Sequence, residues 1–450
     1  WSNVTPKELP EAIVNSIEVS PHDPATAYIT VMAYKFNNLK PMVYKTSDYG
    51  VSWVKRVSGI DDQTVVRVVR EDKEVEGLLY AGTEAGLYIS FNGGVFWQKI
   101  QLNLPIVPIN DLTIQDNDLI AATAGRSFWI LDDLGAFQGS KGKFEKDLML
   151  FQPKKTYRIF GGSTDEPRPG LGQNPKSGVL IDYYLSEKKD SASLHLKVIN
   201  SSGKVIRSLS NGSEEFVSWP GGPQKPVLMP TKRGVNRVVW DFTRAPLPSI
   251  DKVFVYGNYS GGHVAPGTYT LRLILDQDSV ETTVEILADP RVQASFNDYV
   301  SQQEMMISIE QAIKEIHEAV NDMRSAKSQI EYYQSMLEES AVAPEIIELG
   351  GDIIAQIEAW ERALIQPDQK TFQDVINFHN QLNAQWMNLK DYVDSADPIL
   401  TAGAKERFND LKGQWILFQQ TKNQIINEEM EQFNQLYKAL DLPMIMIPNR

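Results

Sequence analysis

Apolar and polar residues alternate with a period of two through the first 140 positions, which predicts β-strands rather than helices. The runs are short, and polar or glycine-containing segments separate them. The strand candidates are residues 27–34, 64–69, 78–82, 111–114, 118–123 and 128–131. We therefore expect an all-β region that ends before the polar stretch 139–143.

An eight-residue pattern occurs twice in this region, at residues 46–53 and 90–97. Both copies have a hydroxyl residue, then Asp or Asn, then Gly, then Trp at matching positions, and they start 44 residues apart. That spacing fits one four-stranded blade of a β-propeller, and it favours a repeat over two unrelated glycine turns. The short polar side chain can accept backbone N–H groups, Gly permits a positive φ, and Trp packs between sheets. The expected structural positions are Thr46, Asp48, Gly50, Trp53, Ser90, Asn92, Gly94 and Trp97.

The repeat extends to the first residues of the sequence. Residues 1–4 look like the segments 53–57 and 97–100 that follow the two patterns, so Trp1 would be the last residue of a further copy. A closed propeller needs about four to eight blades, and this sequence holds little more than two. We expect residues 1–140 to be terminal blades, with the rest of the propeller in an upstream portion of the same protein.

A second all-β unit is predicted for residues 179–288, after a connector at 141–178 that is rich in Pro and Gly. Its strands are short, regularly spaced and separated by Gly and Pro turns, which is typical of a β-sandwich. Trp240 is expected in the sandwich core. Arg158 and Arg168 of the connector could hold an anion, although a solvated linker is the favoured interpretation.

The hydrophobic period changes to 3.6 from residue 289 onward, which predicts a helical domain at 289–450. We expect a long helix from about residue 296, and further helices at about 344–365, 369–394 and 402–440. A bundle of three or four helices would bury these apolar faces. A coiled coil that binds a partner is the alternative.

The repeated pattern resembles the Asp box of sialidases, xyloglucanase-type glycoside hydrolases and the sortilin propeller. Residues 17–28, 78–84 and 125–133 resemble the end of the propeller in large secreted bacterial proteins described as BNR/Asp-box glycosyl hydrolase-like or sortilin-like. Residues 234–241 and 265–269 look like the Ig-like module of flagellar hook-capping proteins. The resemblance implies a secreted, periplasmic or outer-membrane surface protein, and it places Asp boxes at the blade periphery, away from catalytic centres.

Composition narrows the possible partners and cofactors. The net charge is −14 and no block of like charges occurs, which argues against nucleic acid and anionic membranes as partners. The absence of cysteine excludes disulfides and thiol catalysis, and the five histidines fall in separate segments, so no metal site is expected. The sequence contains no phosphate-binding loop, so no cofactor is expected. No apolar run is long enough for a transmembrane span.

Three carboxylates are candidates for glycosidase chemistry, which needs two carboxylates facing each other across a cleft. Asp111 lies near the start of an expected strand, and Asp132 and Asp133 follow the end of another. Side chains of adjacent residues point in different directions, which argues against Asp132 and Asp133 acting as a pair. Residues 131–134 also suit a structural turn.

Arg126 and Trp129 are candidates for ligand binding. An arginine between Gly125 and Ser127, just before a tryptophan-containing strand, could reach a central channel. The structural alternative is that Arg126 bonds carbonyl groups of a neighbouring blade.

Two functional hypotheses follow. The favoured one is an extracellular or cell-surface propeller that binds a glycan or polypeptide and is not catalytic in this region. A sandwich spacer would follow the propeller, and then helices that dock a surface partner. The alternative is an Asp-box glycoside hydrolase whose acid and base lie in the upstream blades. A hydrolase should show two carboxylates about 5–10 Å apart in a cleft.

Overall fold

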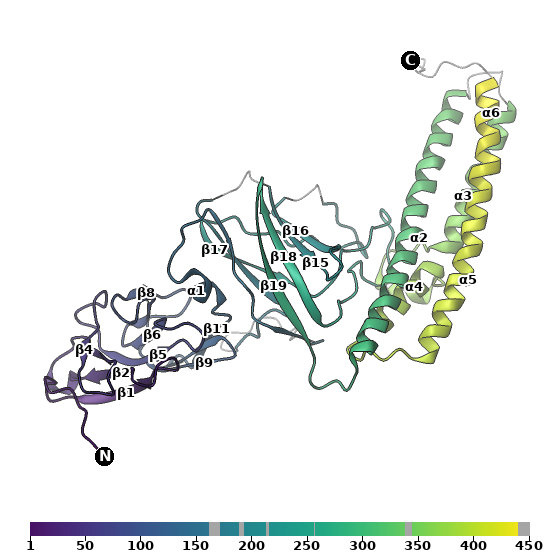
Figure 1. Cartoon of the computed structure of the whole chain (residues 1–450). Helices are drawn as coiled ribbons and strands as arrows, with labels where there is room; N and C mark the ends of the chain where they lie inside the picture. The colour runs from purple at the N-terminus through teal and green to yellow at the C-terminus, as the bar shows by residue number, and fades with distance from the viewer. Residues whose placement is uncertain (162–171, 189–192, 213–215, 256, 338–343, 440–450) are drawn as a thin grey trace.

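The computed structural model describes residues 1–161, 172–188, 193–212, 216–255, 257–337 and 344–439. Figure 1 shows three regions in chain order, with small sheets at one end, larger sheets in the centre and helices at the other end. Within the described residues, we find no helix with the length and apolar character needed to cross a membrane.

The first region contains three antiparallel sheets, which we call blades 1, 2 and 3. In each blade the strands pair in chain order. Blade 1 contains β1 (Ile13–Val19), β2 (Ala27–Met32), β3 (Val43–Thr46) and β4 (Val54–Lys55). Blade 2 contains β5 (Val66–Glu71), β6 (Leu79–Thr83), β7 (Gly86–Ser90) and β8 (Gln98–Ile100). Blade 3 has three strands, β9 (Ile109–Gln115), β10 (Asp118–Thr123) and β11 (Phe128–Leu131). Successive antiparallel meanders of this kind are propeller-like.

The blades pack face to face through two apolar cores. Tyr28 of blade 1 and Trp97 of blade 2 belong to the first core. Tyr80 of blade 2 and Leu112 of blade 3 belong to the second. Because side chains alternate across a strand, blade 2 buries apolar residues on both of its faces.

Each outer face of this stack carries large apolar side chains that are exposed to solvent at its edge strand. On β1, Ile17 is 66 % exposed and Val19 is 62 % exposed, and Ile17 pairs with Ile29 on the face that lies away from blade 2. On β11, Phe128 is 73 % exposed and Ile130 is 58 % exposed, while the alternate residue Trp129 packs toward blade 2. The exposed residues on β1 and β11 are of the same apolar kind as those buried between the blades.

The central region is a sandwich of two sheets around one core. One sheet has the order β12-β14-β17, with β12 (Leu148–Leu150), β14 (Val179–Leu185) and β17 (Gly234–Trp240). The other has the order β13-β19-β18-β15-β16, with β13 (Thr156–Arg158), β15 (Leu194–Ile199), β16 (Val205–Ser210), β18 (Gly267–Leu275) and β19 (Asp278–Ala288). Trp240 is fully buried in the shared core, as predicted.

The segment 141–178 is not only the connector that its composition suggested. It supplies β12 and also β13, which pairs in parallel with β19. Arg158 at the end of β13 is buried, with its guanidinium against the rings of Phe160 and Tyr299. The solvated-linker interpretation is therefore wrong for Arg158, and Arg168 lies outside the described residues.

The helical region contains α2 (Phe296–Leu337), α3 (Pro344–Leu364), α4 (Leu382–Val393), α5 (Ala402–Gln424), a π-helical turn (Ile425–Met430) and α6 (Glu431–Ala439). Gly350 and Gly351 lie inside α3 without ending it. The helix expected at 369–394 begins only at Leu382. Upstream of it, Thr371 and Asp374 form a capping box that starts a short 3-10 helix (Phe372–Ile376) instead.

The sandwich and the helices share an apolar cluster. The segment that follows β17 contributes side chains to the core of the helical region, beside residues of α2 such as Ile313 and Ile316. These sandwich-side residues are Leu247, Ile250, Val253, Val255 and Tyr259, and all are buried. The central and helical regions are therefore joined by packing as well as by the chain.

Candidate functional site

The two Asp boxes form tight turns with matching hydrogen bonds. In the first box, the Thr46 hydroxyl accepts the Gly50 N–H at 2.9 Å, and Asp48 Oδ1 accepts the Ser52 N–H at 2.9 Å. In the second box, the Ser90 hydroxyl accepts the Gly94 N–H at 3.0 Å, and Asn92 Oδ1 accepts the Phe96 N–H at 2.9 Å. The glycines have φ of 86° and 81°, which L-residues rarely adopt. The polar side chains of the boxes thus accept backbone N–H groups of their own turns.

The two box tryptophans make the same contact with the preceding repeat. Trp97 Nε1 donates to the carbonyl of Arg56 at 3.1 Å, and Trp53 Nε1 donates to the carbonyl of Val4 at 2.8 Å. Arg56 lies three positions after Trp53, and Val4 lies three positions after Trp1. The first residues therefore stand beside the first box as residues 53–56 stand beside the second.

Asp111 is part of an ion-pair chain that links the blades. Arg70 of β5 contacts Asp111 of β9 at 2.7 Å and Glu18 of β1 at 3.4 Å. Arg70 Nε also donates to the Leu112 carbonyl at 2.8 Å. One guanidinium thus joins the first strands of all three blades, and the Asp111 carboxylate is one of its partners.

Asp133 closes the turn between β11 and the short helix α1 (Gly135–Ser140). Its backbone has φ of 59°, and its carboxylate accepts the N–H groups of Gly135 at 2.9 Å and Lys154 at 3.2 Å. Asn117 Nδ2 donates to the same carboxylate at 3.1 Å. Burial raises the pKa of the Asp133 carboxyl. These contacts fit the turn interpretation of this residue.

Asp132 takes no part in the hydrogen bonds that the Asp133 carboxylate makes. Its carbonyl accepts Arg237 Nη2 at 2.9 Å, so it ties the last blade to the sandwich. Burial and the nearby charge of Asp118 raise the pKa of the Asp132 carboxyl. The structure therefore places Asp132 at a region boundary, and Asp111 at the blade–blade ion pairs.

Arg126 is exposed in the turn between β10 and β11. Within the described residues its guanidinium contacts only the adjacent Gly125 carbonyl, at 3.4 Å, and makes no bond to a neighbouring blade. Trp129 Nε1 donates to the Arg126 carbonyl at 3.0 Å and thereby fixes the turn. The indole of Trp129 lines a hollow of about 40 Å³ beside Leu104, room for little more than water. Arg126 is thus free to meet a ligand, while Trp129 supports its turn.

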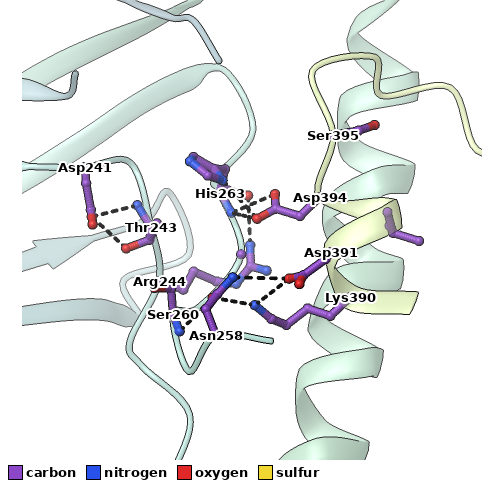
Figure 2. A network of polar contacts seen from close by, with 12 residues as sticks. Asp241, Thr243, Arg244, Asn258, Ser260, His263, Lys390, Asp391, Asp394 and Ser395 are labelled. Carbon is purple, nitrogen blue, oxygen red and sulfur yellow. Dashed lines mark hydrogen bonds and ion pairs between the residues drawn. The ribbon is translucent and has the colours of Figure 1, made fainter. Parts of the chain in front are cut away.

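A polar network, which the sequence did not reveal, joins the sandwich to the helices (Figure 2). Arg244 contacts Glu310 of α2 through two hydrogen bonds of 2.9 Å, and the Gly262 N–H donates to the same carboxylate. The His263 N–H and Nδ1 both contact Asp394 at the end of α4, at 3.1 and 2.9 Å. The partners are 66 and 131 residues apart, so no local pattern could pair them.

Lys390 completes this network. It is 1 % exposed, and its ammonium donates to Asn258 Oδ1 at 2.9 Å and lies 3.3 Å from Asp391. Figure 2 shows these side chains and those of His263 and Asp394 spanning the gap between the sandwich loops and α4. Because its charged groups are paired with each other, the network positions the two regions and leaves no free acid or base within it.

No family model matches the sequence, and no curated protein matches it. Among solved structures, the chain is similar to YCF48 bound to D1 peptide, with 16 % identity and a TM-score of 0.22 over 28 % of this chain and 38 % of that chain. It is also similar to the GH74 enzyme of Niastella koreensis, with 12 % identity and a TM-score of 0.22 over 60 % of this chain and 38 % of that chain.

A third similar structure is the extracellular domain of BT4673 from B. thetaiotaomicron, at 9 % identity and a TM-score of 0.20 over 58 % of this chain and 30 % of that chain. This chain thus spans well under half the length of each of the three structures. TM-scores of this size do not establish a shared fold. The strand order and packing of the three sheets in this chain are what make them propeller-like.

Proposed function

We propose that this chain belongs to an extracellular or cell-surface β-propeller protein that recognises a glycan or a polypeptide, and that these residues bind rather than cleave. The observation that carries the proposal is that two of the three candidate carboxylates, those of Asp111 and Asp133, are engaged in structural contacts. The Asp111 carboxylate forms an ion pair with Arg70, and the Asp133 carboxylate accepts backbone N–H groups of Gly135 and Lys154. A glycosidase instead needs a free acid and a free base or nucleophile on opposite sides of the substrate.

We further infer that the three blades belong to a larger ring. The exposed apolar residues on β1 and β11 support this, because the same kinds of side chains are buried where blade 2 meets its neighbours. Other blades of the propeller would cover both outer faces. On this proposal the sandwich is an Ig-like spacer, and the helices offer a surface for a complex partner.

The proposal is tested by measuring binding and cleavage side by side. The chain is incubated with xyloglucan, arabinoxylan and sialyllactose, and released reducing sugar or sialic acid is quantified. The same polysaccharides and an array of peptides are immobilised to measure retention. We expect retention on at least one surface without release of product.

Product release that is lost in Asp111→Asn or Asp132→Asn, but kept in the exposed control Asp278→Asn, would overturn the non-catalytic assignment. The glycoside hydrolase alternative would then be favoured. An absence of retention on every glycan and peptide would overturn the binding role itself.

A further inference from the structure

A hollow of about 710 Å³, lined mainly by residues with polar side chains, lies where blades 2 and 3 meet α1 and the segment before β13. Its walls include the turn between β9 and β10, the residues after β5, one side of α1 and residues 152–155. Turns alternate between the two edges of an antiparallel meander, so this hollow is at the opposite edge of the blades from Arg126. It is therefore separate from the ligand candidates described above.

The back of the hollow is held in place by partly buried hydrogen bonds around the buried Asp72. Gln138 Nε2 donates to both carboxylate oxygens of Asp72, at 3.2 and 3.1 Å, and to Asn117 Oδ1 at 2.6 Å. Asp72 is fully buried, and it also accepts the Glu74 and Val75 N–H groups at 2.9 Å. The amides of Gln138 and Asn117 are thus fixed in place before any ligand arrives, which lowers the entropy cost of binding.

The mouth of the hollow has unused hydrogen-bonding groups. Within the described part of the chain, the side chains of Gln115 and Gln152 have no hydrogen-bond partner, and nothing donates to Gln138 Oε1. Each glutamine amide can both donate and accept. The hollow therefore presents several neutral donors and acceptors around one space.

The charges of the hollow are largely balanced. Lys154 pairs with Asp118 at 2.6 Å, and Lys155 pairs with Glu285 at 2.8 Å. The remaining lysine, Lys73, shares the lining with two acidic residues, Glu74 and Asp116. A phosphate or sulfate ligand would favour a cluster of unpaired cations, which this lining does not provide.

We propose that this hollow binds a short, uncharged carbohydrate chain. Sugar hydroxyls both donate and accept, which matches the free amides, and the lining also includes the apolar residues Ile114 and Pro153. The volume lies in the range of about 300–1,000 Å³ that is usual for small-ligand sites. The inference rests on the proposed function for the glycan class of ligand, and it adds the place and the chemistry.

The test is a calorimetric titration of the chain with cello-, manno-, xylo- and laminaritetraose, and with tetragalacturonate as a charged probe. We expect at least one neutral oligosaccharide to bind. The double variant Gln115→Ala with Gln152→Ala should raise the dissociation constant of this oligosaccharide by about tenfold or more, because two ligand hydrogen bonds are lost. Both residues are exposed, so the fold should persist, which circular dichroism checks. The exposed Gln63→Ala is the matched control.

Three outcomes would overturn the inference. Unchanged neutral-glycan binding in the double variant would mean that the site lies elsewhere, while the glycan-binding function stands. Binding of tetragalacturonate alone would contradict the uncharged ligand. Binding of no oligosaccharide in the panel would remove the carbohydrate site, and the peptide-retention experiment would then decide the proposed function separately.

Discussion

The indole of Trp53 donates its N–H to the carbonyl of Val4 at 2.8 Å, and Trp97 makes the equivalent contact with Arg56 one repeat later. Each box tryptophan therefore fastens its blade to the chain segment that follows the preceding tryptophan. Trp97 is almost completely buried, Trp53 is partly covered, and Trp1 is fully exposed. Trp97 and Trp53 make the repeat contact at different degrees of burial, and the exposed Trp1 serves as a reference for the same residue type without burial.

Replacing Trp97 by Ala should lower the free energy of unfolding of the blades by about 3–5 kcal/mol, as for other buried aromatic truncations. The loss has two sources, the cavity between blades 1 and 2 and the unpaired Arg56 carbonyl. Urea unfolding followed by tryptophan fluorescence measures it. Trp1→Ala is the control and should leave the midpoint unchanged. A Trp97→Ala midpoint equal to that of the wild type would contradict the blade packing.

The local features of this fold were accessible from the sequence, and the long-range ones were not. The box turns depend on contacts within five consecutive residues, such as Thr46 to Gly50, so their chemistry is visible in the pattern. Trp240 followed from its place in an alternating strand. In contrast, β13 pairs in parallel with a strand about 130 residues away, and nothing in its three residues indicates that partner.

The candidate site shows the same division. The sequence singled out Asp111 and Asp133 as unusual, but it could not show that Arg70 and Lys154 engage them. The glutamines around the hollow were missed because a single neutral amide carries no sequence signal. Only the fold brings Gln115, Gln138 and Gln152 to one space.

The ion pair between Arg244 and Glu310 should be costly to break from one side. Both side chains are nearly buried, at 9 % and 13 % exposure, so Glu310→Gln would leave a guanidinium without its counter-charge. Removal of one partner of a buried pair costs about 3–5 kcal/mol, whereas replacement of both is often close to neutral. We therefore expect Arg244→Met with Glu310→Leu to be more stable than Glu310→Gln alone. A double-mutant cycle by chemical denaturation measures the coupling.

A coupling energy near zero in that cycle would contradict the role of the pair. Arg272→Met with Glu281→Leu is the matched control, because that pair lies exposed on the β18–β19 hairpin. Its coupling should not exceed about 1 kcal/mol.

Acid should loosen the contact between the sandwich and α4 through Asp394. Burial alone would raise the pKa of this carboxyl, but the hydrogen bonds and charge of His263 and the charge of Arg158 outweigh it and hold the pKa below its usual range. The unfolded chain therefore binds this proton more readily than the folded chain. The stabilisation is fully present above the ordinary pKa of 3.8 and is lost as pH falls through the lower folded value.

Asp394→Asn should remove this part of the acid sensitivity, so the stability difference from the wild type should shrink between pH 6 and pH 2. Urea midpoints at each pH provide the measurement. Asp298→Asn is the control, because hydrogen bonds from Ser295 also lower the pKa of this carboxyl, but it lies outside the contact between the sandwich and α4. A difference between Asp394→Asn and wild type that stays constant across this range would contradict the assignment.

The exposed face of blade 1 should promote self-association of the isolated chain. Ile17 and Val19 place two large apolar side chains in solvent on one face of β1. Ile17→Lys with Val19→Lys should lower the apparent mass in light scattering at high protein concentration, with little change in the unfolding midpoint. Val205→Lys, on the sandwich, is the control for adding charge at an exposed apolar position. An equal drop in mass for both would show that net charge, rather than this face, governs association.

Deletion of residues 291–450 should destabilise the sandwich, because the two regions share an apolar cluster. The buried side chains of Leu247, Ile250, Val253 and Tyr259 would lose the helices that cover them. Exposed apolar surface of this kind leads to dye binding and aggregation. We expect the truncated chain to bind an apolar fluorescent dye and to melt at a lower temperature than the full chain. If the truncated chain instead gave a sandwich transition at the full-chain temperature without dye binding, the shared core would contribute nothing to the stability of the sandwich. Ser replacements at Leu247 and Ile250 in the full chain should reproduce part of the loss, because they place the same defect in an otherwise complete interface.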